Sequence, residues 1–255
     1  MRMIKQLAIA AWESSVQQWS WRSFLVTLVL NQAIGPLIGL LLWTAVMPDS
    51  SAVRGYFFAV LAVQLLTVSY EDHTFSNSIY DGTIVDGLLR PRPVIMNAAG
   101  ANLGLRFWHG IFGLPVLLLV AITAGLPLRL GDVVLAVPAL IIAGVLRFLF
   151  TITLALTAFW TDRASALVSF GDTGIALLGG IAAPLFLLPG PIAEAGRWLP
   201  FWSMLGLPGE IAAGVLTGPQ LVAGYAVQAG WLLVLIVVTA LVWRRGLRVF
   251  TAVGA

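Results

Sequence analysis

Long apolar stretches alternate with short polar breaks along this chain. Six stretches are long enough to cross a bilayer, at roughly 20 residues per crossing. They lie at about 24–47, 53–70, 105–126, 133–160, 164–188 and 221–243. The breaks carry turn-forming or charged residues, such as Pro48-Asp49 and Asp162-Arg163. The pattern predicts an all-α membrane protein with six transmembrane helices in a single domain, residues 1–255.

The first 22 residues form an amphipathic segment that is too polar to span. Their apolar residues recur at steps of three and four, as on one face of a helix: Ile9, Trp12, Val16 and Trp19. A helix of this kind, with tryptophan at its edge, is typical of the membrane interface. The alternative is a helix that packs on a soluble partner.

A second non-spanning segment covers residues 71–100. Within it, apolar residues fall roughly on one side of a short helix, while Asn77, Asp81 and Asp86 lie off that side. The apolar residues are Phe75, Ile79, Ile84, Val85, Leu88 and Leu89. We expect the apolar side to rest on the membrane bundle. The polar side would then face a water-soluble partner, or only solvent.

Residues 189–219 form a third unusual segment. They are rich in proline and glycine but remain apolar, unlike an ordinary solvated loop.

Composition places the chain in a membrane and excludes several kinds of chemistry. Hydrophobic residues make up 60% and charged residues 10%, so no aqueous fold could bury the apolar residues. The absence of cysteine excludes disulfides and thiolate sites. Lys5 is the sole lysine and follows no glycine-rich loop, so the chain lacks a phosphate-binding Walker motif. No catalytic residue and no metal site is predicted.

The distribution of basic residues predicts the orientation. With six spans, both termini lie on the same side of the membrane. That side collects ten basic residues, against three on the other: Arg54, Arg129 and Arg197. The ten are Arg2, Lys5, Arg22, Arg90, Arg92, Arg106, Arg163, Arg244, Arg245 and Arg248. Because basic loops stay on the cytoplasmic side, both termini are expected in the cytoplasm.

Two charged residues lie inside the predicted spans. Arg147 belongs to the fourth span and Asp172 to the fifth. A charge in the bilayer is costly and usually finds a partner or faces water. We therefore expect either an interhelical ion pair between the two residues or a substrate or proton site.

Four uncharged polar residues occur in the first two spans: Asn31, Gln32, Gln64 and Thr67. They could line a transport pathway, or they could join helices through hydrogen bonds. The sequence leaves both interpretations open.

The run from Ile79 to Pro91 resembles a signature of ABC-2-type permeases, I-x-x-G-x-(I/L)-x-x-x-L-L-R-P. Gly82, Ile84 and Leu88-Leu89-Arg90-Pro91 occupy the matching positions. Two later regions are also similar to the family. One is Gly180-x-x-x-Pro184-Leu185-Phe186-x-Leu188-Pro189, followed by Leu199-Pro200-Phe201. The other is Trp231 with the sixth span and the Arg244-Arg245-Gly246 exit, so the resemblance covers nearly the whole chain.

The resemblance implies a membrane subunit of an ATP-binding-cassette exporter. Residues 5–20 would be its elbow helix, 74–89 its coupling helix, and 189–219 a re-entrant segment on the outer face. ATP and Mg would bind to a separate ATPase subunit, and a second permease chain, identical or paralogous, would complete the pathway. The residues implied to couple to the ATPase are Ile79, Asp81, Gly82, Ile84, Asp86, Leu88, Leu89, Arg90 and Pro91.

These expectations place the protein in the inner cell membrane, with no nucleic-acid partner and no catalysis of its own. The alternative is a non-ABC channel or secondary transporter that uses Arg147 and Asp172 as an intramembrane pair. The motifs carry no information on the transported substrate.

Overall fold

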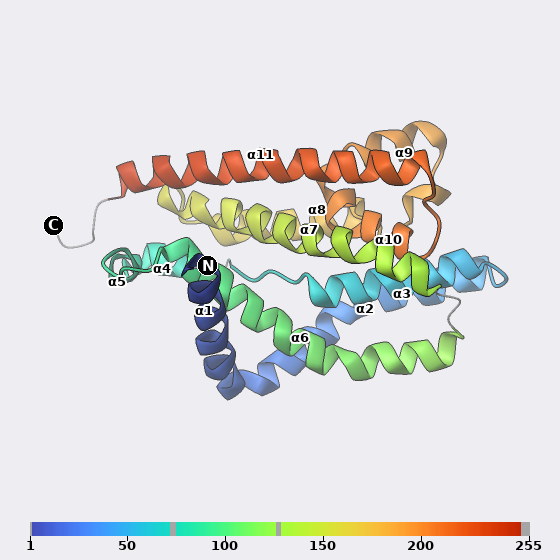
Figure 1. Cartoon of the computed structure of the whole chain (residues 1–255), viewed down its shortest axis with the longest axis horizontal. Helices are drawn as coiled ribbons and strands as arrows, with labels where there is room; N and C mark the ends of the chain where they lie inside the picture. The colour runs from blue at the N-terminus through green and yellow to red at the C-terminus, as the bar shows by residue number, and fades with distance from the viewer. Residues whose placement is uncertain (1, 72–74, 126–128, 251–255) are drawn as a thin grey trace.

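A computed structural model of the protein describes residues 2–71, 75–125 and 129–250, and these residues contain helices and no strand (Figure 1). The long helices are α2 (Arg22–Val46), α6 (Val94–Ala124), α7 (Leu130–Ala155) and α11 (Pro219–Val249). Those of intermediate length are α1 (Arg2–Gln18), α3 (Ser51–Leu66) and α8 (Ala164–Leu178). The short helices are α4 (Asn77–Tyr80), α5 (Ile84–Leu88), α9 (Gly190–Arg197) and α10 (Leu207–Ala212). Single turns fill some connections: η1 (Trp19–Trp21), η3 (Leu156–Phe159), η4 (Leu185–Leu187) and the π-type turn η5 (Trp202–Gly206).

The longer helices run side by side along the long axis of the molecule, whereas α1 crosses them steeply near one end (Figure 1). That end also carries α4, α5 and the C-terminal end of α11. Helices α9 and α10 lie at the opposite end, beside the start of α11. The arrangement separates the two segments that the sequence marked as unusual, 71–100 and 189–219.

Within the described residues, four helical stretches are long and apolar enough to cross a membrane. They are Met3–Val46, Val94–Ala124, Leu130–Phe159 and Pro219–Val249. The helices predicted as the second and fifth spans are shorter, at 16 and 15 residues. The chain is thus a multi-pass, all-helical membrane protein.

Three predicted span boundaries differ from the bounds of the helices. The helix predicted as the second span ends at Leu66 rather than at residue 70, and the helix predicted as the fifth ends at Leu178 rather than at residue 188. Gly179 and Gly180 end α8, and Gly180 has a φ of 104°, which a residue with a side chain rarely adopts. The third span begins at Val94 instead of residue 105, directly after Pro93, which suits a helix start. Its predicted end at Leu126 lies outside the described residues.

Helix α3 forms the centre of the bundle. Tyr56, Val60 and Leu65 are fully buried there, and Phe57 and Leu61 almost so. The surrounding apolar residues come from α2, α6, α7, α8 and η5. A helix at the centre of a bundle can be shorter than the membrane is thick, because protein rather than lipid surrounds the backbone beyond its ends.

Helix α1 packs closely on the first half of α6 at Gly100. A Cβ atom on Gly100 would lie 2.5 Å from the Cβ atom of Ala10, so the two backbones approach closely. The indole Nε1 of Trp108 also donates to the carbonyl of Ser15 at 2.9 Å. Of the predicted stripe, Ile9, Trp12 and Val16 are exposed. The ring of Trp19 lies 4.8 Å from that of Trp108 on α6, between centroids.

Candidate functional site

The segment between α3 and α6 contains two short helices where the sequence predicted one. Helices α4 and α5 are separated by Asp81, Gly82 and Thr83, and Gly82 has a φ of 71°. Left-handed backbone at this position favours glycine and interrupts the helix. The predicted continuous helix over 74–89 was therefore wrong, and its first residue, Thr74, lies outside the described residues.

Three apolar side chains fix this segment to the bundle. Phe75, Ile79 and Ile84 are buried in one cluster with residues of α7, η3 and α8, including Phe148, Ile152 and Leu156. The ring of Phe75 also lies 6.1 Å from that of Trp243, on α11, between centroids. The buried half of the predicted amphipathic pattern is thus confirmed.

Hydrogen bonds attach the same segment to the connection between α7 and α8. The hydroxyl of Tyr80 donates to the carbonyl of Thr161 at 3.1 Å and accepts from the backbone N–H of Ala164 at 2.9 Å. Ser76 donates to the carbonyl of Ala155 at 3.3 Å. A displacement of α4 would therefore move the α7–α8 connection with it.

We expect Tyr80→Phe to weaken this attachment without changing the apolar packing. Loss of the hydroxyl leaves the Thr161 carbonyl and the Ala164 N–H without this partner, at a cost of about 1–3 kcal/mol. Hydrogen exchange should increase in residues 75–90 and around 160–166, with little change in α2. Unchanged exchange in both regions would show that the hydroxyl bonds do not hold the segment.

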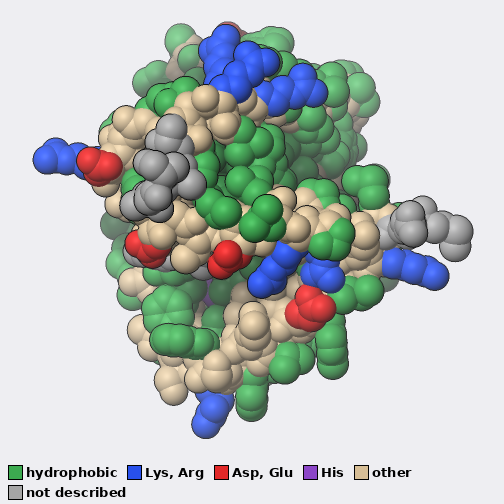
Figure 2. All heavy atoms as spheres, turned by 90° about the vertical axis from the view of Figure 1, so that its left-hand side faces the viewer, with side chains coloured by type: hydrophobic (Ala, Val, Ile, Leu, Met, Phe, Trp, Pro, Cys, Tyr) green, Lys and Arg blue, Asp and Glu red, His purple; other side chains and the backbone are tan. Residues whose placement is uncertain are grey.

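The other side of the segment is exposed. Leu89 exposes 81% of its surface and Leu88 40%, so the prediction that both rest on the bundle was wrong. Asp81, Asp86, Arg90 and Pro91 are exposed beside them. Figure 2 views this end of the molecule and shows acidic and basic side chains scattered over a largely uncharged surface. We call Asp81, Asp86, Leu88, Leu89 and Arg90 the leucine-acidic face.

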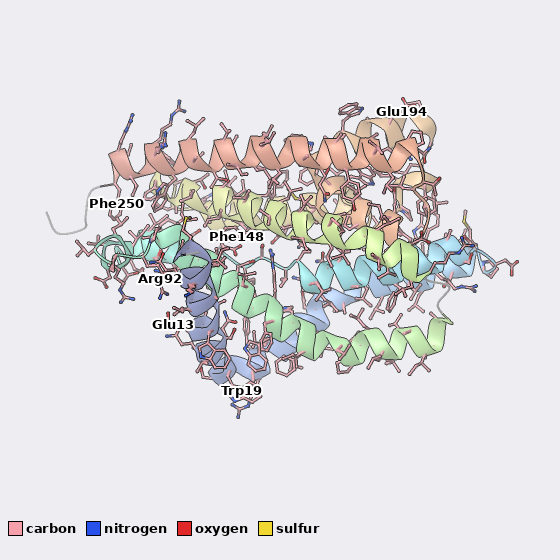
Figure 3. All side chains as sticks on the ribbon, in the orientation of Figure 1. Glu13, Trp19, Arg92, Phe148, Glu194 and Phe250 are labelled. Atoms are coloured by element: carbon pink, nitrogen blue, oxygen red, sulfur yellow. The ribbon has the colours of Figure 1, made fainter. Side chains whose placement is uncertain are left out.

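An ion pair ties the end of this segment to α1. The Nη1 atom of Arg92 lies 2.8 Å from the Oε2 atom of Glu13, and Figure 3 shows the two residues next to each other where α1 crosses the bundle. Because both side chains are partly exposed, the pair contributes about 0–1 kcal/mol. It orients the segment more than it stabilises the fold.

A buried polar network occupies the interior next to this segment. Arg147, which is 3% exposed, donates through Nη1 to the side chains of Gln64 at 2.9 Å and Thr67 at 3.0 Å. Gln64 in turn donates to Gln32, which joins α2, α3 and α7. Three of the predicted polar residues are thus brought together around Arg147. Asn31 is exposed and lies outside this network.

Asp172 is placed differently from Arg147. Its side chain is exposed on α8, whereas Arg147 is buried. The direct hydrogen bonds of Arg147 described above go to α3. An ion pair between the two residues stays a prediction.

Arg106, which was predicted among the ten basic residues of the cytoplasmic side, lies within α6 and binds the backbone of neighbouring segments. This arginine lies about 18 Å along α6 from Val94, at 1.5 Å per residue. Its guanidinium donates to the carbonyls of Val68 at 3.0 Å, Thr67 at 3.3 Å and Gly144 at 2.7 Å. Arg106 thereby supplies hydrogen-bond donors to the backbone carbonyls that follow the end of α3.

Asn102, one turn before Arg106 on α6, binds the same non-helical stretch that follows α3. Its amide donates to the carbonyl of Val68 at 3.3 Å and to the carboxylate of Glu71 at 2.6 Å. The spacing of Asn102 and Arg106, four residues apart on one helix face, was a signal in the sequence that both face the same neighbour. Within the described ranges, no group of three or more His, Asp or Glu side chains is arranged to hold a metal ion.

Comparison with known proteins gives one family. A model described as "ABC-2 family transporter protein" matches residues 17–254, nearly the entire chain. No curated protein and no solved structure gives a significant match. The matched range includes the exposed 75–93 segment, the buried arginine network and α11. The chain therefore belongs to the ABC-2 family of transporter membrane proteins.

Proposed function

We propose that this chain is the permease subunit of an ABC exporter. It would pair with a second permease chain and be driven by separate ATPase subunits that bind ATP and Mg. The observation that carries the proposal is the leucine-acidic face, where two exposed leucines stand beside carboxylates on a segment fixed to the bundle. Exposed apolar side chains next to charges are typical of a protein interface.

The proposed topology has six spans: α2, α3, α6, α7, α8 and α11. Helix α3 is about 24 Å long at 1.5 Å per residue, short of the roughly 30 Å hydrocarbon core. Residues 67–70 would complete its crossing, and residues 179–188 would complete that of α8. Both termini would then lie in the cytoplasm at the inner membrane.

Two peripheral segments fit this topology. Helix α1 would be the elbow helix, because its apolar stripe is exposed to the membrane interface while its other side packs on α6. Helices α9 and α10 would form the outer re-entrant segment, which lies at the opposite end of the bundle from α4 and α5 (Figure 1).

The coupling mechanism follows from how the segment is held. Closure of the ATPase pair would displace α4 and α5 as a unit, because Phe75, Ile79 and Ile84 are embedded in the bundle. Tyr80 would pass this displacement to the α7–α8 connection. The two permease chains would then exchange inward-facing and outward-facing arrangements. The family match favours this mechanism over the alternative channel or secondary transporter.

The test is co-expression of the chain with the ATPase encoded by a neighbouring reading frame. We expect the ATPase to co-purify with the full chain and its ATP hydrolysis to change when the complex is placed in vesicles. A reporter fused after residue 255 should be active only in the cytoplasm. Failure of every Walker-motif protein of the host to bind the chain, or a C-terminus outside the cell, would overturn the proposal.

A further inference from the structure

A groove of about 720 Å³ opens between α9, η5 and the outer half of α11. It lies at the end of the molecule opposite α4 and α5, on the side of the bundle that α11 covers (Figure 1). Its volume falls within the range of small-molecule sites in proteins. It is separate from the leucine-acidic face and from the buried arginine network.

Small residues on α11 create the apolar part of the groove. Ala223, Ala226 and Gly230 line it with Val227 and Val234, at the helical spacing of three and four residues. A Cβ atom on Gly230 would meet no atom within 4 Å. The groove is therefore empty beside Gly230.

The length of the groove matches one leaflet of a bilayer. From Gln220 to Val234 it follows α11 for about 21 Å, at 1.5 Å per residue. Half of the hydrocarbon core measures about 15 Å. An acyl chain lying along α11 would thus fit the apolar part and leave room for a head group at the outer end.

Charged residues of both signs also line the groove. Glu194 and Arg197 of α9 line it together with Gln220. The buried Nε atom of Arg197 has no hydrogen-bond partner among the described residues. Figure 3 shows Glu194 on α9 beside the start of α11. A guanidinium binds phosphate oxygens well, and a carboxylate binds an ammonium group.

Two tryptophans join α9 to α11 about 16 Å along α11 from Gln220, at 1.5 Å per residue. The indole Nε1 of Trp231 donates to the carbonyl of Trp198 at 2.9 Å, which connects α11 to the end of α9. Trp198 is largely exposed.

We propose that this groove binds one phospholipid of the outer leaflet whose head group carries a phosphate and an amine. The acyl chain lies along Ala223, Ala226 and Gly230, the phosphate contacts Arg197, and the ammonium group contacts Glu194. This arrangement pairs Arg197 and Glu194 with opposite charges on the ligand. The inference rests on the proposed topology, which puts the start of α11 at the outer side of the membrane, and not on the export mechanism.

The experiment uses the purified full chain in vesicles that contain a phosphatidylethanolamine with a photoactivatable acyl chain. After irradiation, the labelled positions are mapped by mass spectrometry. We expect labelling to concentrate at residues 223–234 and at Trp198. Gly230→Leu should reduce it at least about fivefold, because the new side chain fills open space in the groove. Arg197→Gln should reduce it about threefold or more.

Matched controls separate the groove from the ordinary lipid shell. Gly131→Leu adds the same side chain at another glycine with open space, and Arg129→Gln removes an arginine that does not line the groove. In both variants, the labelling of residues 223–234 should equal that of the unmodified chain. A photoactivatable diacylglycerol, which lacks phosphate and amine, should label the groove several-fold less.

Three outcomes would overturn the proposal. Labelling spread evenly over the exposed face of α11, unaffected by Gly230→Leu, would indicate the lipid shell alone. Equal labelling by the diacylglycerol would remove the role of Arg197 and Glu194. Crosslinks from residues 223–234 to a second protein chain would show that a protein covers the groove. Co-purification of the ATPase is independent of all three results.

Discussion

Arg106→Leu is expected to lower the folded yield of the protein sharply and to reduce its melting temperature. The substitution removes the donor of hydrogen bonds to the carbonyls of Thr67, Val68 and Gly144. A buried carbonyl without a partner costs about 1–3 kcal/mol. The carbonyl of Val68 keeps the amide of Asn102 as a partner, and that of Gly144 lies within α7, so the main loss falls on the carbonyl of Thr67. A loss of about 1–3 kcal/mol corresponds to a fall in Tm of roughly 2–12 °C for a chain of this size.

The measurement is thermal unfolding of the detergent-purified protein, followed by its elution profile on size exclusion. Arg163→Leu is the matched control, because that arginine is exposed at the α7–α8 connection. Arg106→Lys should rescue only in part, since an ammonium group cannot place several donors in a planar fork. A melting temperature of Arg106→Leu equal to that of Arg163→Leu would contradict the role given to Arg106.

Gly144 offers an independent check of the same contact. A Cβ atom at this position would lie 2.7 Å from the Nη1 atom of Arg106. Gly144→Val should therefore displace the guanidinium and destabilise the protein in the same direction as Arg106→Leu. The destabilisation of the double variant should be smaller than the sum of the two single destabilisations, because both substitutions remove the same interaction.

The second large effect is expected from the double substitution Leu88→Glu and Leu89→Glu. Under the proposed function these leucines enter the ATPase subunit, and two charges there would be buried without partners. Association should weaken at least about 100-fold, since a few central apolar residues usually dominate an interface. Because both side chains are exposed in the isolated chain, its yield and Tm should stay unchanged.

Binding is measured by co-purification and by the stimulation of ATP hydrolysis in vesicles. Leu130→Glu is the control, since this leucine is equally exposed at the other end of the bundle and begins α7, where an acid is tolerated. An ATPase that binds the double variant with wild-type affinity would rule out the leucine-acidic face as its docking surface. The lipid groove would be unaffected by that result.

The sequence by itself determined the membrane class, the helical architecture and the family. These follow from the hydropathy of long segments and from glycine and proline positions, both of which act locally. The motif from Ile79 to Pro91 also marked the exposed segment correctly. The buried residues Phe75, Ile79 and Ile84 of the segment follow the helical period.

The tertiary structure alone decided the rest, because it depends on contacts between distant residues. The end of α3 at Leu66 is stable only because Arg106 and Asn102, about 35 residues away, supply donors to the unwound backbone. No local pattern distinguishes such an arginine from a loop charge, and none distinguishes Leu88 from Ile84 as the exposed residue. The groove along α11 likewise exists only because α9 and η5 fold back beside it, so its charges and its small residues lie far apart in the chain.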